Sequence, residues 1–181
     1  MMAESPFLTL PRTVTGSTGR IAPCDIGLPV LRVVLGVIMV VHGTQKLYGW
    51  FDGVGTKTTG MFFSKAGYPA GETMATIAGL TETLGGLGLI LGLLTPLAAA
   101  AIVGVMINAI CVKWTGAVLG MQGVEFESLI IAAAVTLALA GPGRFALDHF
   151  VPVLRDHRPV YGVMALVLGV VLAAAVLLLR D

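Results

Sequence analysis

Charged side chains are scarce in this sequence. Asp, Glu, Lys and Arg make up 12% of its 181 residues, whereas soluble domains carry about 25%. Hydrophobic residues make up 56%, and the mean hydropathy is +0.94. The basic residues form no run and the formal net charge is only +1, so there is no electrostatic footprint for nucleic acid. This composition indicates an integral membrane protein and excludes nucleic acid as a partner.

Cysteine is also scarce, and the short motifs of several enzyme classes are missing. The sequence contains no CxxC, HExxH, GxSxG or P-loop pattern, which argues against thiol exchange, zinc-dependent hydrolysis, acyl transfer and nucleotide binding. Cys24 and Cys111 are expected at opposite membrane faces, too far apart for a disulfide. The Asp-His pairs at 148–149 and 156–157 are interpreted as solvated connector residues, so we predict no metal site.

Long apolar runs define the organisation of the chain. A helix needs roughly 20 residues to cross a hydrocarbon core of about 30 Å, and all but the fourth run approach that length. We predict an all-α integral membrane protein: a four-helix transmembrane bundle with an additional C-terminal transmembrane helix. The expected spans are 26–47, 72–94, 97–114, 127–140 and 160–179, with a short interfacial helix at 56–65.

These spans divide the chain into three regions. Residues 1–25 lack the apolar run and cleavage site of a signal peptide, so we predict a flexible N-terminal tail. Residues 26–150 form the four-helix membrane domain. Residues 151–181 contain a connector and the fifth transmembrane helix, which we expect to be an appended anchor without site chemistry.

Basic residues in the connecting segments predict the orientation. A cytoplasmic N-terminus places more of them inside than outside, so we expect the N-terminus inside and the C-terminus outside. The inside residues are then Arg12, Arg20, Arg144, Arg155 and Arg158, and the outside residues are Lys57, Lys65 and Arg180.

Several polar residues are expected at one depth in the outer half of the membrane. His42 and Lys46 lie near the end of the first helix, and Glu82 lies about two turns from the outer end of the second. A charged residue costs about 2.5–3.5 kcal/mol at the bilayer centre and normally faces the bundle interior. We therefore predict that Glu82 is buried within hydrogen-bonding or ion-pair reach of His42 or Lys46. The other residues expected in this region are Asn108, Glu125, Glu127 and Trp50.

Each of these residues also has a plainer interpretation. His42 and Lys46 could extend to the lipid headgroups at the helix end. Glu82 and Asn108 could form interhelical contacts that serve packing alone, contributing about 0.6–2 kcal/mol. Lys113 lies at the opposite helical phase from Asn108, so we expect it to reach the interface and to take no part in a site.

Four segments, in this order and spacing, resemble the successive motifs of the DoxX family of bacterial membrane proteins. The similarity covers about residues 28–150. It implies a four-helix bundle in the bacterial plasma membrane, described as an oxidoreductase component and related to the membrane subunit of a thiosulfate:quinone oxidoreductase. It also implies association with soluble redox or oxidative-stress proteins. The segments are HGTQKLYGWFDGVG at 42–55, ETLGGLGLILGLLTPLAA at 82–99, GVEFESL at 123–129 and GPGRFALD at 141–148.

The first functional hypothesis is a redox-linked membrane subunit with a polar pocket in the outer leaflet. The pocket would bind a quinone or a comparable small molecule, with Glu82 and His42 as catalytic residues that exchange protons. The sequence shows no ligand set for haem or an iron–sulfur cluster, so electrons would come from a partner or a bound substrate. The residues expected to bind the ligand are Lys46, Asn108, Glu127 and Trp50.

Two alternatives stay open at this point. The chain could be a non-enzymatic assembly platform for soluble redox proteins, alone or as a homo-oligomer. It could instead provide a pathway for protons or small solutes, which intramembrane ionisable residues permit. The pathway is the weaker alternative, because Arg32 is the only obvious polar residue expected in the inner leaflet.

Overall fold

The structure is a computed structural model that describes residues 22–120, 123–151 and 158–180. Within these ranges the protein is helical and has no strand, as the sequence predicts. Most of the predicted tail and the second Asp-His pair, at 156–157, lie outside the described residues. The elements are α1 (Pro23–Tyr48), α2 (Gly55–Lys65), α3 (Gly71–Leu91), α4 (Thr95–Lys113), α5 (Glu125–Ala140), the short 3₁₀ helix η1 (Leu147–Phe150) and α6 (Pro159–Leu177).

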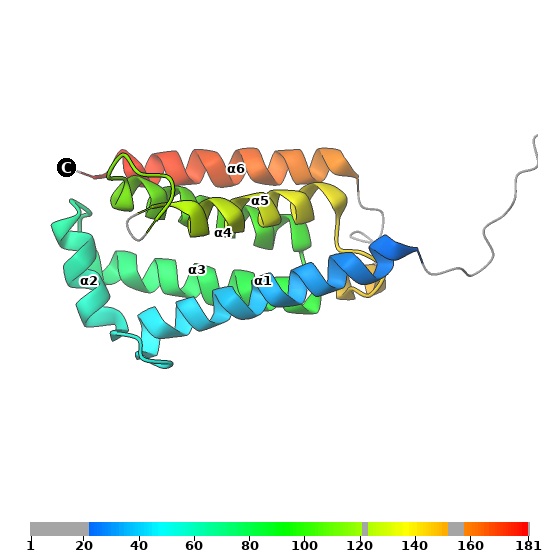
Figure 1. Ribbon diagram of the computed structural model, residues 1–181, viewed down its shortest axis with the longest axis horizontal. Helices are drawn as coiled ribbons and strands as arrows, with labels where there is room; N and C mark the ends of the chain where they lie inside the picture. The colour runs from blue at the N-terminus through cyan, green and yellow to red at the C-terminus, as the bar shows by residue number, and fades with distance from the viewer. Residues whose placement is uncertain (1–21, 121–122, 152–157, 181) are drawn as a thin grey trace, which may run out of the picture.

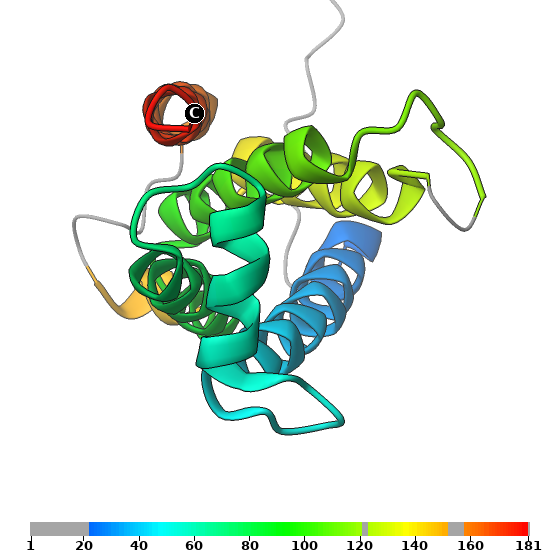
Figure 2. The same ribbon diagram turned by 90° about the vertical axis from the view of Figure 1, so that its left-hand side faces the viewer.

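The long helices lie side by side, and α2 crosses one end of them (Figure 1). The direction of the chain reverses between successive long helices, so α1 begins and α6 ends at opposite ends of the bundle. We call the end crossed by α2 the Lys46 end and the opposite end the Arg32 end. Figure 2 looks onto the Lys46 end, with α2 in front. The helix predicted at 56–65 is confirmed as α2, and its orientation suits a membrane interface.

Glycines allow α1 and α3 to approach each other closely. A Cβ added to Gly86 would lie 2.6 Å from the carbonyl oxygen of Gly36, and one added to Gly43 would lie 2.6 Å from that of Gly79. Small residues permit this backbone contact, which is the main source of helix association in lipid. The same contact brings the end of α1 against the middle of α3, where the polar residues lie.

The C-terminal helix α6 does more than anchor the chain, contrary to our expectation. A Cβ added to Gly169 would lie 2.5 Å from the carbonyl oxygen of Ala100 in α4, and one added to Gly162 would clash with the carbonyl of Ala138 in α5. These close contacts show that α6 is packed as a member of the bundle. The fold is therefore a transmembrane bundle extended by an integrated C-terminal helix.

Within the residues that the structure describes, four helices are long and apolar enough to cross a membrane: α1, α3, α4 and α6. The remaining long helix, α5, has 16 residues, about 24 Å at 1.5 Å per residue, which is short for a core of about 30 Å. Its shortness matches the sequence prediction. Exposed Val, Leu and Met side chains cover the outer surface of α6, as expected for contact with lipid.

Arg32 binds the connector that follows α5. Its Nη2 donates a hydrogen bond of 2.6 Å to the carbonyl oxygen of Phe145, and its Nη1 donates to that of Pro142. The side chain is buried at the Arg32 end, and the two carbonyl oxygens accept hydrogen bonds from its charged guanidinium group. The connector therefore folds back onto α1.

Asp148 connects the same region to the turn between α3 and α4. We interpreted Asp148 as a solvated connector residue, and this is wrong, because it is only 2% exposed. Its Oδ1 accepts a hydrogen bond of 2.7 Å from the Leu94 N–H, and its Oδ2 accepts one of 3.1 Å from the Thr95 N–H. The first N–H groups of a helix lack intrahelical partners and favour an anionic acceptor. Asp148 therefore caps α4 from a distant part of the chain.

Candidate functional site

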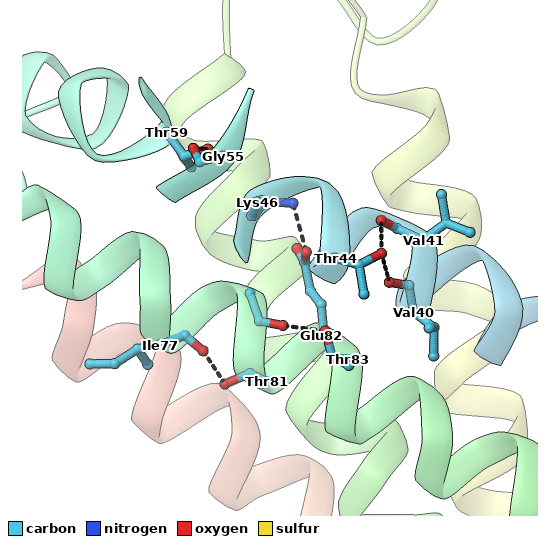
Figure 3. Close-up of polar contacts among 11 residues, drawn as sticks. Val40, Val41, Thr44, Lys46, Gly55, Thr59, Ile77, Thr81, Glu82 and Thr83 are labelled. Atoms are coloured by element: carbon cyan, nitrogen blue, oxygen red, sulfur yellow. Dashed lines mark hydrogen bonds and ion pairs between the residues drawn. The ribbon is translucent and has the colours of Figure 1, made fainter. Parts of the chain in front are cut away.

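Lys46 and Glu82 form an ion pair between α1 and α3. Lys46 Nζ lies 2.6 Å from Glu82 Oε2, and the side chains are 25% and 2% exposed. Figure 3 shows the lysine pointing from the end of α1 toward the carboxylate. The predicted contact of Glu82 with Lys46 is confirmed.

The threonines around this ion pair use their hydroxyls within their own helices. Thr44 Oγ1 donates to the carbonyl oxygens of Val40 and Val41, and Thr83 Oγ1 donates to that of Gly79 (Figure 3). Hydroxyls bonded in this way satisfy the preceding turn of the helix. Lys46 is thus the partner that compensates the Glu82 carboxylate.

A second ion pair joins α4 and α5, and it corrects our interpretation of Lys113. Lys113 Nζ lies 2.6 Å from Glu127 Oε1, with side chains that are 50% and 7% exposed. From its helical phase we expected the Lys113 side chain to extend to the membrane interface and to take no part in a site. However, Lys113 is the last residue of α4 and lies at the level where α5 begins. Its long side chain reaches the first turn of α5, which runs antiparallel to α4. Opposite charges at the end of one helix and the start of the next were the signal that sequence reasoning missed.

His42 lies close to residues of both ion pairs along the chain. Its ring centroid lies 5.5 Å from that of Phe126 in α5, which directly precedes Glu127. It also lies one turn before Lys46 in α1. The Lys46 end therefore carries a group of polar residues, contributed by α1, α3, α4 and α5, which we call the polar cluster. The polar cluster consists of His42, Lys46, Glu82, Lys113 and Glu127.

Asn108 belongs to a separate network at the same end. Its Oδ1 accepts a hydrogen bond of 2.9 Å from Tyr68 Oη, and its Nδ2 donates to the carbonyl oxygens of Gly104 at 3.1 Å and Ala173 at 3.3 Å. These hydrogen bonds go to α6 and to the segment before α3 and not to the polar cluster. The plainer interpretation of Asn108, an interhelical contact, describes this geometry.

Arg180 extends this network beyond the end of α6. Its guanidinium lies 5.9 Å from the centroid of the Tyr68 ring, and its Nε donates a hydrogen bond of 2.5 Å to the carbonyl oxygen of Ala66. Burial raises the pKa of the Tyr68 hydroxyl, and the nearby positive charge opposes this shift. No spacing pattern would join Arg180 to Tyr68, since the two residues are 112 positions apart in the sequence. These contacts fix the start of α3 against the end of α6.

Trp50 lies apart from the polar cluster. It is 58% exposed, and its ring centroid lies 5.2 Å from that of Tyr48. Paired exposed aromatic rings after the end of a transmembrane helix are typical of the membrane interface. In this structure Trp50 is therefore an interfacial residue, and a ligand would have to extend out of the cluster to contact it.

The polar cluster provides donors, acceptors and an imidazole on rigid helices. Lys46 has three N–H donors, and one is used by Glu82. Glu127 uses Oε1 for Lys113, while its buried Oε2 has no hydrogen-bond partner among the described residues. Such a set can bind a small polar ring compound and exchange protons with it.

The DoxX family model matches residues 27–117. The chain is 34% identical over 128 residues to a Bacillus subtilis protein named "Putative oxidoreductase CatD", covering 70% of this chain and 88% of that protein. It is 30% identical over 133 residues to a Mycobacterium tuberculosis protein named "Uncharacterized membrane protein Rv3486", covering 66% of this chain and 77% of that protein. No solved structure matches the chain significantly.

Proposed function

Since this chain belongs to the DoxX family, we propose that it is a redox-linked membrane subunit that binds a quinone or a comparable small molecule at its Lys46 end. The observation that carries this proposal is the polar cluster, in which two interhelical ion pairs occur at the same end of the bundle as His42, whose ring contacts Phe126 beside Glu127. The Bacillus subtilis relative is named as an oxidoreductase, which supports redox chemistry as the class.

The choice of residue types favours a binding site over simple packing. Interhelical hydrogen bonds from Ser, Thr or Asn would fix the register without the cost of removing charges from water. This chain instead places Glu82 with Lys46, and Glu127 with Lys113, beside an imidazole. Buried titratable groups of this kind are more typical of functional sites than of packing contacts.

We assign roles by chemistry. Glu82 and His42 exchange protons with the ligand, because a carboxylate and an imidazole serve as general acids and bases. Lys46 compensates charge and donates to a ligand oxygen through its free N–H groups. Glu127 also binds the ligand. Asn108 and Trp50 are proposed as outer contacts for a ligand that extends beyond the polar cluster.

Electrons come from a partner or a bound substrate in this proposal. Soluble redox or oxidative-stress proteins are the proposed partners, docked at the membrane surface. The quinone is the proposed cofactor or substrate, and it supplies reversible transfer of two electrons and two protons when bound. This chain contributes the site that orients it and the side chains that hold its protons.

Replacing Glu82 by glutamine tests the proton-exchange role. Glu82→Gln keeps the shape but removes the exchangeable carboxylate, so membrane insertion and assembly should persist while quinone-linked activity falls at least about a hundredfold, the lower end of the range for loss of a general acid–base. Activity is measured in membranes with the native partners present. Glu72→Gln is the matched control, because Glu72 lies in the exposed first turn of the same helix.

A second function, the non-enzymatic assembly platform, has one observation in its favour. Both ion pairs join different helices, α1 to α3 and α4 to α5, as packing contacts would. Equal activity of the wild type and Glu82→Gln would support this platform and contradict the proton-exchange role.

We also propose that the chain lies in the plasma membrane with its N-terminus in the cytoplasm. The Lys46 end, near the end of α6 (Figure 1), then faces outward. A reporter that is active only outside the cytoplasm, fused after residue 181, should be active. A C-terminal reporter active only in the cytoplasm would contradict this orientation.

A further inference from the structure

We propose that the polar cluster prefers the hydroquinone form of its ligand over the quinone form, because Glu127 offers a buried acceptor that only a donor can satisfy. This inference rests on the proposed quinone site and specifies which oxidation state that site binds best. It concerns binding alone and involves no electron transfer.

Glu127 is almost completely buried and only half satisfied. The residue is 6% exposed, and Lys113 Nζ occupies its Oε1 at 2.6 Å. Its Oε2 is buried without a hydrogen-bond partner among the described residues. An ionised carboxylate is an acceptor only, so the complement of Oε2 is a hydroxyl or another N–H or O–H donor.

The location of Glu127 connects this oxygen with the proposed ligand. Glu127 lies in the first turn of α5, directly after Phe126, whose ring contacts His42. His42 in turn lies one turn before Lys46 in α1. A ring compound bound to the cluster would therefore meet an acceptor on the α5 side and ammonium donors from Lys46.

The two oxidation states of the ligand differ at this acceptor. The carbonyl oxygens of a quinone only accept hydrogen bonds, so they repel the Glu127 carboxylate. A hydroquinone hydroxyl donates to the carboxylate, and its oxygen can still accept from Lys46. A hydrogen bond to a charged group changes affinity by at least about tenfold, so the preference for the hydroquinone should be of at least that size.

The first experiment compares three probes that share a tetramethyl-substituted six-membered ring and uses the full chain in lipid nanodiscs without oxygen. The probes are tetramethylhydroquinone, its dimethyl ether and tetramethylquinone, and binding is measured by calorimetric titration. The wild type should bind the hydroquinone at least about tenfold more tightly than the ether or the quinone. Equal affinities for all three would overturn the preference and leave the quinone site intact, whereas no binding of any probe would overturn both proposals.

The second experiment removes the acceptor. In Glu127→Gln the preference should fall to within about threefold, because the neutral amide accepts less strongly and also offers a donor to the quinone. Glu125→Gln is the matched control, since exposed Glu125 lies two residues earlier and its Oε2 accepts from the Gly120 N–H. An unchanged preference in folded Glu127→Gln would overturn the assignment. If that variant does not fold, the wild-type comparison with the dimethyl ether still decides the question.

Discussion

Replacing Gly43 by alanine should force α1 away from α3 and lower the free energy of unfolding by about 3 kcal/mol, the upper range for overpacking of a close contact. The added Cβ would lie 2.6 Å from the carbonyl oxygen of Gly79 and 2.7 Å from the backbone nitrogen of Thr83. Both are backbone atoms of α3, so rotation of a side chain could not relieve these contacts. Because Lys46 follows Gly43 by one turn, the shift would also lengthen the ion pair with Glu82.

Gly27→Ala is the control, because Gly27 lies in the same helix and a Cβ there has no neighbouring atom within 4 Å. Alanine in a helix is favoured over glycine by roughly 0.5–1 kcal/mol, so this variant should match or slightly exceed the wild type. Thermal denaturation in detergent, followed by circular dichroism, compares the two. Equal melting temperatures for Gly43→Ala and the wild type would contradict the close α1–α3 contact.

Lys46→Met should also be strongly destabilising, by about 3–5 kcal/mol, because removing one partner of a buried ion pair leaves the other charge uncompensated. Glu82 is 2% exposed and has Lys46 at 2.6 Å. Methionine keeps most of the apolar stem of the lysine, so the decrease in the free energy of unfolding is caused mainly by removal of the positive charge. Chemical denaturation in mixed micelles gives the free energy of unfolding.

The double variant Lys46→Met with Glu82→Gln separates the ion pair from other effects. It should recover at least half of the loss, because no buried charge is left without a partner. Lys57→Met is the control for the same change of residue type at an exposed lysine outside the bundle helices. If Lys46→Met is as stable as Lys57→Met, then the ion pair with Glu82 is not a determinant of stability.

The sequence predicts the helices and one of the two ion pairs for clear physical reasons. The apolar runs are long enough to cross a membrane, and Pro96 directly after Thr95 forces the tight turn between α3 and α4. Glu82 and Lys46 each lie at a helical phase and depth where lipid contact would be expensive, so each requires a protein partner. Their contact follows from these two restrictions.

The sequence does not predict the contacts that depend on a neighbouring connector or on the end of a helix. Helical phase failed for Lys113, because a long side chain in the last turn can bend across to the next helix. Local composition failed for Asp148, whose polar surroundings in the sequence suggested solvent although it is buried against α4. Both errors arise because phase and composition describe an isolated segment, whereas these partners come from another one.

The hydrogen bond from Asn108 to Ala173 has a consequence for the biogenesis of the protein. The chain leaves the ribosome from its N-terminus, so α4 enters the membrane well before α6 has been synthesised. Until then, the Asn108 amide lacks its acceptor on Ala173, and the groove along Gly104 that α6 will fill faces lipid or the insertion machinery. The interface between α4 and α6 is therefore completed only after α6 has been translated, which is later than the insertion of α4.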